Sequence, residues 1–332
     1  MSTSVPPARR AWRCRRLDGG LSMANCIIRK HPALFAAGIA AGLGAAAVYG
    51  MAPRTGNKTV DERWNEFARY RYAHRGLHDD SLGAPENSLA AFRRAREYGF
   101  GVELDVHLTA DDRLVVIHDS DLKRMTGKEG TVEELTRPQL EEYRLNGTDQ
   151  GIPTLGEVLR IFEWDGRGSM PAPLIIEIKT YCENADLLTS RVMECLDTFD
   201  VRYCIESFDP AVLVWLRRNR PEVIRGQLSM DFLADDAGAS AKALPLPLRV
   251  GATALLGNVA TKPDFIAYRF DDREQPAVRL VCGTLGGKLV TWTIRSERDM
   301  LASEAEGAPV IFEGFVPAPQ SCVAAHWASP TA

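Results

Sequence analysis

The stretch YGFGVELDVHLT, residues 98–109, combines a strand pattern with charges that a buried strand does not ordinarily carry. Gly99 stands where a helix C-cap is expected, and a short apolar run, Gly101–Asp105, follows it. Glu103 and Asp105 are two positions apart, so their side chains point to the same face of the strand. An unpaired charge in a buried strand is costly, so these carboxylates need partners.

Short runs of this kind recur along the chain, with helical patterns between them. Three segments, 86–99, 210–222 and 296–307, are typical of amphipathic helices with a polar face. Eight strands alternating with helices over about 250 residues predict an α/β fold, a (β/α)8 barrel of the TIM type. A doubly wound open sheet is the alternative. The expected strands are Tyr70–Ala73, Gly101–Asp105, Leu174–Ile178, Tyr203–Glu206, Val223–Gln227, Asp264–Tyr268, Leu289–Ile294 and Pro309–Phe312.

The expected barrel occupies residues 70–318 and has one interruption. The stretch RLVVIHDS, residues 113–120, predicts an additional hairpin strand, and residues 119–153 are expected to form a small insertion between the second barrel strand and its helix. Residues 54–69 are expected to form a linker and a lead-in helix. Residues 319–332 are expected to be a C-terminal tail.

The N-terminal part has a different composition. Residues 1–31 form a basic tail, with a net charge of +6 over the first thirty residues. Residues 32–53 follow, and the twenty residues between Pro32 and Pro53 carry no charge. About twenty apolar residues are enough for a helix to span a bilayer, so a transmembrane signal anchor is predicted here. A cleaved secretory signal and a soluble Ala-rich helix are the alternatives.

The positive-inside rule would keep the basic tail in the cytoplasm and place the catalytic domain outside it. Five cysteines in the body argue weakly against an oxidising compartment. The positive-inside rule outweighs the cysteines here. The expected location is the membrane, with a single N-terminal helix and an extracytoplasmic catalytic domain.

Composition excludes several classes of protein. The 332 residues are 45% hydrophobic and 25% charged, which is ordinary for a globular chain. The net charge is −4, and the part after residue 30 carries −10, so nucleic acid is not an expected partner. The seven cysteines show no CxxC pattern, which argues against a zinc–cysteine site. An acidic body suits a bound cation better than a bound polyanion.

A second strand repeats the pairing of charges. In PLIIEIKT, residues 173–180, Glu177 and Lys179 are again two apart. With Glu103 and Asp105, they give three carboxylates and one lysine at strand ends, where TIM barrels carry their active sites. A hard divalent cation with an anionic ligand would need this set. Internal salt bridges are the alternative, but one lysine is too few for three acids.

Two histidines also stand at strand ends. His74 follows the first strand in YAHRG, and His118 ends the hairpin strand in VVIHD. One could take a proton and the other give one, as general acid–base catalysis requires. His107 is expected to have left the barrel interior, and His78 is assigned no role. The chain has no P-loop, no GxGxxG, no HExxH and no GxSxG motif.

Together these motifs resemble the glycerophosphodiester phosphodiesterase family. The resemblance runs from about Tyr72 to Phe315 through HRG, PENSLAAF, VELDVHLTADDRLVVIHD, IPTLGEVL, LIIEIK, ESF and VTWTI. It implies a (β/α)8 barrel with a small insertion after the second strand. The activity it implies is metal-dependent hydrolysis of glycerophosphodiesters to glycerol 3-phosphate and an alcohol.

The resemblance also implies roles for individual residues. Glu103, Asp105 and Glu177 are then the ligands of one divalent cation, Ca²⁺ or Mg²⁺. His74 and His118 are then the acid–base pair, with His74 as the expected base and His118 as the expected acid. The implied phosphate-binding residues are Arg75 and Lys179, and the residues implied to line the glycerol pocket are Phe208 and Trp292.

Other interpretations stay open from the sequence. Phe208 and Trp292 could be plain barrel core, and Glu86 and Asn87 of PEN could cap a helix or fix a loop as well as act in catalysis. A lysophospholipase-D-like activity on lysophospholipids at the membrane is the alternative reaction. A non-catalytic barrel that binds phosphodiesters or lipid headgroups is the alternative of another class. The segments YRFDD and VIFEGFVP depart from the family pattern and leave the leaving-group specificity open.

Overall fold

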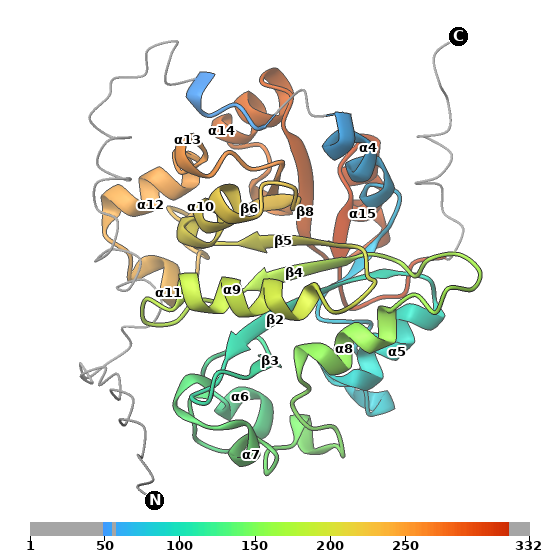
Figure 1. Ribbon diagram of the computed structural model, residues 1–332. Coiled ribbons are helices and arrows are strands. Elements are labelled where there is room, and N and C mark those ends of the chain that lie inside the picture. Colours follow the sequence, from blue (N-terminus) through green and yellow to red (C-terminus); the bar gives the residue numbers. More distant parts are fainter. Residues whose placement is uncertain (1–48, 55–57, 319–332) are drawn as a thin grey trace, which may run out of the picture.

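A computed structural model of the chain describes residues 49–54 and 58–318. Eight parallel strands close into a barrel in the order β1-β2-β4-β5-β6-β7-β8-β9, because β1 pairs with both β2 and β9 (Figure 1). This closure confirms the predicted barrel and excludes the open doubly wound sheet. The strands are β1 Tyr72–Ala73, β2 Gly101–Leu108, β3 Leu114–Val116, β4 Leu174–Ile178, β5 Tyr203–Ser207, β6 Arg225–Ser229, β7 Phe265–Arg269, β8 Lys288–Ile294 and β9 Val310–Phe312.

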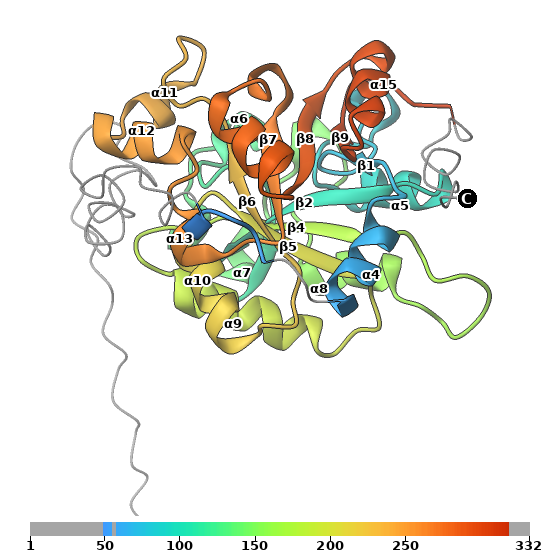
Figure 2. The same ribbon diagram turned by 90° about the horizontal axis from the view of Figure 1, so that it is seen from above.

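Helices surround the barrel on its outside (Figure 2). Those that cover its wall carry their own start signals: Ser88 and Ser296 cap α5 and α15, and Thr154 forms a capping box with Glu157 at α8. The α-helices are α4 Lys58–Phe67, α5 Leu89–Glu97, α6 Lys123–Thr126, α7 Arg137–Leu140, α8 Leu155–Phe162, α9 Ala185–Leu196, α10 Pro210–Asn219, α11 Ala239–Lys242, α12 Leu246–Thr253, α13 Asn258–Thr261, α14 Pro276–Val278 and α15 Glu297–Ala305.

Seven of the eight predicted strands differ from the observed ones at a boundary, four of them by one residue. The second strand runs three residues further than predicted, to Leu108. The strand predicted at Val223–Gln227 begins two residues later, because Val223 still belongs to the turn that follows α10 and donates its amide to Arg220. The first strand is shorter than predicted, since Tyr70 is still in the turn that leaves α4. Apolar residues extend beyond the ladder in both cases, and their pattern alone does not show where pairing starts.

Residues after β2 form a small satellite structure beside the barrel. Strand β3 pairs antiparallel with the end of β2, and α6 and α7 follow it (Figure 1). Their apolar side chains make a separate core that includes Ile117, Leu122, Leu140 and Leu145. This core lets the segment hold residues against the carboxyl end of the barrel.

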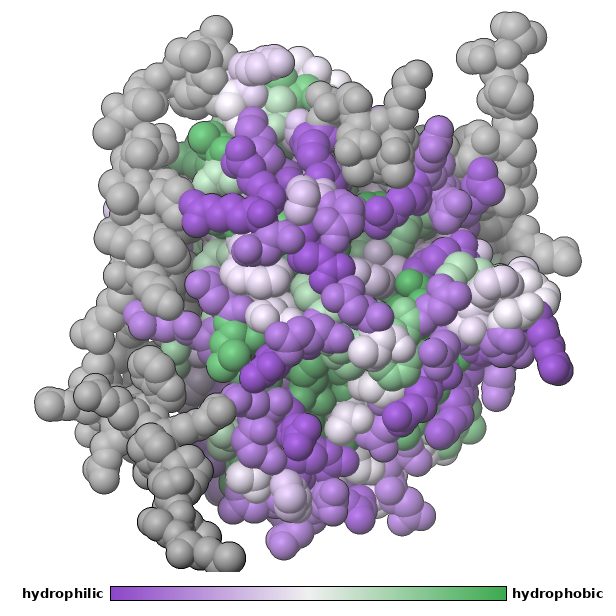
Figure 3. Space-filling model, in the orientation of Figure 1, coloured by the Kyte–Doolittle hydropathy of each residue, from purple (hydrophilic) through white to green (hydrophobic). Residues whose placement is uncertain are grey.

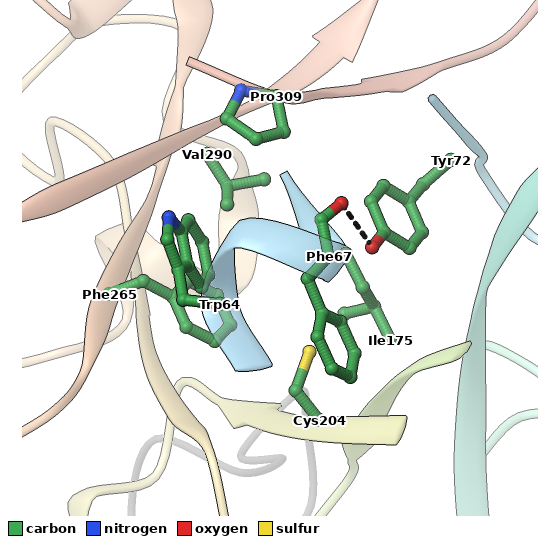
Figure 4. Close-up of a pocket in the computed structure, with 8 residues that line it drawn as sticks. All are labelled: Trp64, Phe67, Tyr72, Ile175, Cys204, Phe265, Val290 and Pro309. Atoms are coloured by element: carbon green, nitrogen blue, oxygen red, sulfur yellow. Dashed lines mark hydrogen bonds between the residues drawn. The ribbon is translucent and has the colours of Figure 1, made fainter. Parts of the chain in front are cut away.

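The amino end of the barrel is closed by α4. Trp64 and Phe67 of this helix lie against Tyr72, Ile175 and other apolar side chains of the barrel interior (Figure 4). The Tyr72 hydroxyl donates a hydrogen bond of 2.9 Å to the Phe67 carbonyl, so the one polar atom of this ring is satisfied. We call this apolar layer the barrel floor. The outer face shown in Figure 3 is mostly hydrophilic, with apolar side chains scattered among the polar ones.

The segment predicted to enter a membrane, residues 32–53, lies outside the described residues except for 49–53. The basic tail 1–31 and the tail 319–332 lie outside them as well. In the described ranges, 49–54 and 58–318, none of the helices is both long and apolar enough to cross a bilayer.

Candidate active site at the carboxyl end of the barrel

Three carboxylates meet at the carboxyl end of the barrel. Glu103 and Asp105 lie on β2, and Glu177 lies on β4 directly beside Asp105 in the ladder. All three side chains are buried, and one oxygen of each lies within 4.8 Å of the others. This spacing is compatible with a single divalent cation bound by oxygen ligands. The structure thus confirms the prediction that these three carboxylates lie close together.

Lys179 and Arg75 supply the positive charge of the site. The Lys179 ammonium lies 2.7 Å from Glu177 Oε2 and 3.1 Å from Asp105 Oδ1. The backbone amide of Arg75 donates to Glu103 Oε2 at 3.1 Å, and its Nε lies 3.6 Å from Asp105 Oδ2. Three acids therefore face two cations, and the excess of negative charge is what a metal ion would neutralise.

Burial governs the protonation of these groups. Burial raises the pKa of Glu177 to about 7, although the Lys179 ammonium opposes the shift. Burial, with Asp105 and Glu177 nearby, also raises the pKa of Glu103 well above its usual range. The pKa of Asp105 moves the other way despite its burial, because Lys179, His118 and Arg75 favour its carboxylate. Glu103 Oε1 has no hydrogen-bond partner among the described residues, so the carboxylate set fits a cation.

The two predicted histidines border this cluster, and each is held by a carboxylate. His74 Nδ1 lies 2.5 Å from Glu313 Oε2, while its Nε2 lies 3.8 Å from Glu103 Oε2. His118 Nδ1 lies 2.6 Å from Asp119 Oδ1. A carboxylate at Nδ1 favours the tautomer that leaves Nε2 as the acceptor. Both rings are thus oriented as acid–base groups usually are.

The environment lowers the pKa of both rings. Burial, followed by the charge of Lys179, lowers the pKa of His118 to about 4. Burial also lowers the pKa of His74, although its hydrogen bond to Glu313 opposes the shift. In the absence of a bound anion both imidazoles are therefore neutral at pH 7.

The loop after β1 fixes Arg75. Asn87 does not cap α5, because Ser88 is the cap; instead its amide donates to Asp105 Oδ2 at 2.8 Å. Glu86 accepts from Arg75 at 2.9 Å and from Arg124 of α6 at 2.7 Å. The two PEN residues therefore position charges in the site, as the loop-fixing alternative predicts, and Asn87 is not the cap of α5.

The other two histidines lie outside the acid–base arrangement. His107 is buried between Glu133 Oε1 at 2.6 Å and the carbonyl of His118 at 3.1 Å. It ties the end of β2 to the satellite structure and so supports the position of His118. His78 lies 3.9 Å from Glu313 and adds only a weak contact.

Aromatic side chains from the ends of β5 and β8 and from the segment after β6 contact one another. The ring centroids of Phe208 and Trp292 are 5.8 Å apart with planes at 87°, and Phe208 and Phe232 are 6.1 Å apart at 89°. Neither Phe208 nor Trp292 is fully buried. Within the described part of the chain, the buried Trp292 Nε1 has no hydrogen-bond acceptor. Such a donor could bind a substrate oxygen.

Two carboxylates of this site were not singled out in the sequence. Glu313 directly follows β9 and holds His74, although VIFEGFVP was noted only as a departure from the family pattern. Glu206 on β5 lies beside Glu177 in the ladder and is fully buried. Both follow the rule that strand ends carry the chemistry of a TIM barrel, so that rule would have found them.

This fold and these side chains define a barrel enzyme with an acidic site at its mouth. The model of the glycerophosphoryl diester phosphodiesterase family matches residues 74–313. The chain is 30% identical to a glycerophosphodiester phosphodiesterase of Caldanaerobacter subterraneus subsp. tengcongensis over 237 residues, 69% of this chain and 86% of that protein. The chain belongs to this family and is a phosphoric diester hydrolase, which sets aside the non-catalytic alternative.

Solved structures share this fold. A glycerophosphodiester phosphodiesterase from Thermotoga maritima has a TM-score of 0.53 and 26% identity over 73% of this chain and 93% of that one. A phosphodiesterase from Oleispira antarctica, solved with the product sn-glycerol-3-phosphate, has a TM-score of 0.58 and 22% identity over 74% and 92%. A lysophospholipase D of Rattus norvegicus is 33% identical over 146 residues, 40% of this chain and 42% of that protein.

Proposed function

We propose that this phosphodiesterase hydrolyses glycerophosphodiesters to glycerol 3-phosphate and an alcohol, with one divalent cation held by Glu103, Asp105 and Glu177. The observation that carries the proposal is the approach of three buried carboxylates to within 4.8 Å. Oxygen-only ligands select a hard cation, so the ion is Ca²⁺ or Mg²⁺. When bound, such an ion neutralises charge on the phosphoryl oxygens.

Arg75 and Lys179 bind the phosphodiester in this proposal. The Arg75 guanidinium is planar and can donate two parallel hydrogen bonds to a phosphate. The Lys179 ammonium stays protonated, because Asp105 and Glu177 raise its pKa in spite of its burial. Phe208 and Trp292 hold the glycerol moiety, with the Trp292 Nε1 proton available to a hydroxyl.

The two histidines move the protons. His74 Nε2 takes a proton from the nucleophile, which is water or the neighbouring glycerol hydroxyl. Attack by the hydroxyl gives a cyclic glycerol phosphate, which a water molecule must then open to glycerol 3-phosphate. His118 gives a proton to the leaving alkoxide, which it first acquires as the anionic substrate enters. Each ring is kept in position by its carboxylate, Glu313 or Asp119. Replacing either histidine by Ala is expected to reduce turnover by about 10²–10⁴-fold.

Release of glycerol 3-phosphate from glycerophosphocholine tests the reaction. The full chain is assayed with Ca²⁺, with Mg²⁺ and with chelator, and the Glu103→Ala variant serves as the control. Metal-dependent release that the variant lacks supports the proposal. Release that is equal with chelator would overturn the metal-dependent reaction.

A substrate with a good leaving group tests which histidine is the acid. Hydrolysis of a p-nitrophenyl phosphodiester of glycerol releases p-nitrophenolate. This leaving group is stable as an anion and needs no proton from the enzyme. The His118→Ala variant is expected to recover most of its activity on this substrate, and the His74→Ala variant is not. Recovery of the His74→Ala variant alone would reverse the assignment.

Hydrolysis of lysophospholipids is the second candidate. The contacting rings of Phe208, Trp292 and Phe232 give the site an apolar side that suits a lipid chain, and a lysophospholipase D is among the similar proteins. Hydrolysis of lysophosphatidylcholine, measured against glycerophosphocholine under the same conditions, distinguishes the two. A higher kcat/KM on the lysolipid would favour the second candidate.

The proposed location is the membrane, through residues 32–53, with the catalytic domain on the extracytoplasmic side. The basic tail and the uncharged segment support it. Protease treatment of intact cells should then digest the catalytic domain. Digestion only after lysis would contradict the outward orientation.

A further inference from the structure

The start of the described chain is fixed to the barrel wall without a flexible connection. The Lys262 ammonium donates to the carbonyls of Gly50 at 2.5 Å and Ala52 at 3.3 Å. Met51 is only 3% exposed and packs in a cluster with Leu255 and Ile266. The residues that end the predicted membrane segment therefore already belong to the barrel.

An ion pair completes this attachment. The Arg54 guanidinium makes two hydrogen bonds to the Asp264 carboxylate, at 2.8 and 2.9 Å. Asp264 also accepts from the backbone amide of Arg225, which starts β6, at 3.0 Å. The Arg54 amide donates to the carbonyl of Pro263. Five hydrogen bonds thus hold residues 50–54 at the start of β7.

This attachment removes any slack between the barrel and the apolar segment. On the membrane location proposed above, residues 33–49 remain for the bilayer, and about 17 residues are close to the fewest that can span one as a helix. The next residue is already fixed to the protein, and one residue extends at most about 3.6 Å. The surface next to Gly50 must then lie within a few ångströms of the lipid.

That surface carries exposed apolar side chains. Val259 of α13 lies beside Gly50, with its methyl groups about 3.6–3.8 Å from the position of a Cβ there, and is 47% exposed. Leu246 and Val250 stand one turn apart on α12, 61% and 42% exposed, and Tyr49 is 77% exposed. We call Tyr49, Leu246, Val250 and Val259 the α12–α13 face. Figures 1 and 2 place α12 and α13 on the flank of the barrel opposite α15.

A cation borders this face. Arg217 of α10 is exposed and donates to the carbonyl of Ala260, next to Val259, at 2.6 Å. Aliphatic side chains with an aromatic ring and a flanking arginine are the composition of protein surfaces that lie in the interface of a bilayer. Isolated exposed apolar residues are common, but Val259 and Tyr49 adjoin the point where the uncharged segment enters the fold, and Leu246 and Val250 lie on the preceding helix α12.

We propose that the α12–α13 face rests on the lipid bilayer that holds residues 33–49. The barrel is then oriented by its own wall as well as tethered by its N-terminus. The connection from β6 to α12 runs from the barrel mouth, where Phe232 contacts Phe208, to this face.

Photolabelling from the lipid tests this orientation in the unaltered chain. The full chain is reconstituted in vesicles of phosphatidylcholine and phosphatidylglycerol that contain a phosphatidylcholine with a diazirine in its acyl chain. After illumination, label is expected on peptides from 246–261. Peptides from 297–305 are the matched control, because Leu301 of α15 is 50% exposed on the opposite flank. Label that is absent from 246–261, or equal on both segments, overturns the proposal.

A pair of variants sharpens the test. Leu246→Glu with Val250→Glu should reduce labelling of 246–261 several-fold, while Leu301→Glu leaves it unchanged. Hydrolysis of soluble glycerophosphocholine should be the same in both variants, because none of these residues lies at the barrel mouth. Undiminished labelling in the double variant would contradict the proposal. Labelling does not depend on turnover, so a failure of the proposed reaction would leave this result readable.

Discussion

The barrel floor and the barrel mouth are built on the same strands, two residues apart. The inward positions at the floor hold apolar side chains and one tyrosine whose hydroxyl is hydrogen-bonded: Tyr72, Ile175, Cys204 and Ile311. Two residues further along the same strands stand His74, Glu177, Glu206 and Glu313. Two residues of strand rise only about 6.6 Å. A single step of the pleat therefore separates a layer that stabilises the fold from a layer of buried charge.

The difference shows that the floor stabilises the fold and that the mouth carries the catalytic groups. The floor removes Trp64, Phe67 and Phe265 from water, and Gly226 makes room for the Phe265 ring, since a Cβ there would lie 2.2 Å from it. The mouth instead buries carboxylates whose raised pKa values report an unfavourable environment for their charge. Variants of the two layers should therefore have opposite effects on activity and stability.

Removing one charge from the mouth should give the largest effect. The Glu103→Gln variant is expected to lower kcat/KM by about 10³–10⁴-fold, because metal ligation supplies several kcal/mol to the transition state. Its unfolding free energy in chelator should not fall, since the change relieves repulsion with Asp105 and Glu177. Kinetics and denaturant unfolding of the same preparation check both expectations. Marked destabilisation in chelator would mean that Glu103 has a structural role.

A change in the floor should do the reverse. Trp64→Ala is expected to lower the unfolding free energy by about 3–5 kcal/mol, the usual effect of removing a large buried aromatic side chain. The kcat of the folded fraction should stay within a factor of about two, because an entire layer separates Trp64 from the site. Leu301→Ala on the exposed surface is the control, with an expected change within about 0.5 kcal/mol. A drop in kcat for Trp64→Ala alone would couple the two layers.

Much of this contrast could be read from the sequence, because it depends on the period of a strand. The pairs Glu103/Asp105 and Glu177/Lys179 show the same two-residue spacing, and a charge in a buried strand has few explanations other than function. The alternation of strands and helices predicted the barrel for the same reason. Local periodicity is set by the backbone, so it survives any tertiary arrangement.

Other parts depended on contacts far apart in the chain. Glu313 lies 239 residues from His74, and only barrel closure between β9 and β1 brings them together. The start of β6 is set by pairing with β5, since Ile205 lies opposite Arg225. The attachment of Arg54 to Asp264 likewise spans 210 residues. No local pattern encodes which residues such contacts bring together, although the position of Glu313 at a strand end could have marked it as a site residue.

Glu313 offers an intermediate test of the mouth. Glu313→Gln should lower kcat by about 10–100-fold, since a hydrogen bond to a charged group is worth roughly 1.5–3 kcal/mol. The carboxylate raises the pKa of His74, so its loss should move the acid limb of kcat/KM to lower pH. Glu306→Gln, which alters an exposed pair with Arg273, is the control. An unchanged acid limb would argue that Glu313 does not tune His74.

The smallest effect concerns the dependence of metal stabilisation on pH. A carboxyl group whose pKa is higher in the folded chain than in the unfolded one stabilises the fold below the unfolded value, and that stabilisation is lost as pH rises. Glu177 should therefore weaken the metal-free fold between about pH 4.5 and 7, with Glu103 and Glu206 acting in the same direction. Asp105, whose pKa is lowered, acts in the opposite direction, but only near and below the ordinary aspartate pKa of 3.8.

A cation that binds the carboxylates competes with these protons, so it should stabilise the fold more at pH 8 than at pH 5. Melting temperatures with saturating Ca²⁺ or Mg²⁺, minus those in chelator, should rise by a few degrees across this range, because 1 kcal/mol shifts the midpoint by about 2–4 °C at this size. In Glu103→Gln the increment should be small at both pH values. If metal raised the melting temperature of the unaltered chain equally at pH 8 and pH 5, the carboxylates would already be ionised before metal binds. The buried charges of the mouth would then destabilise the fold less than their burial implies.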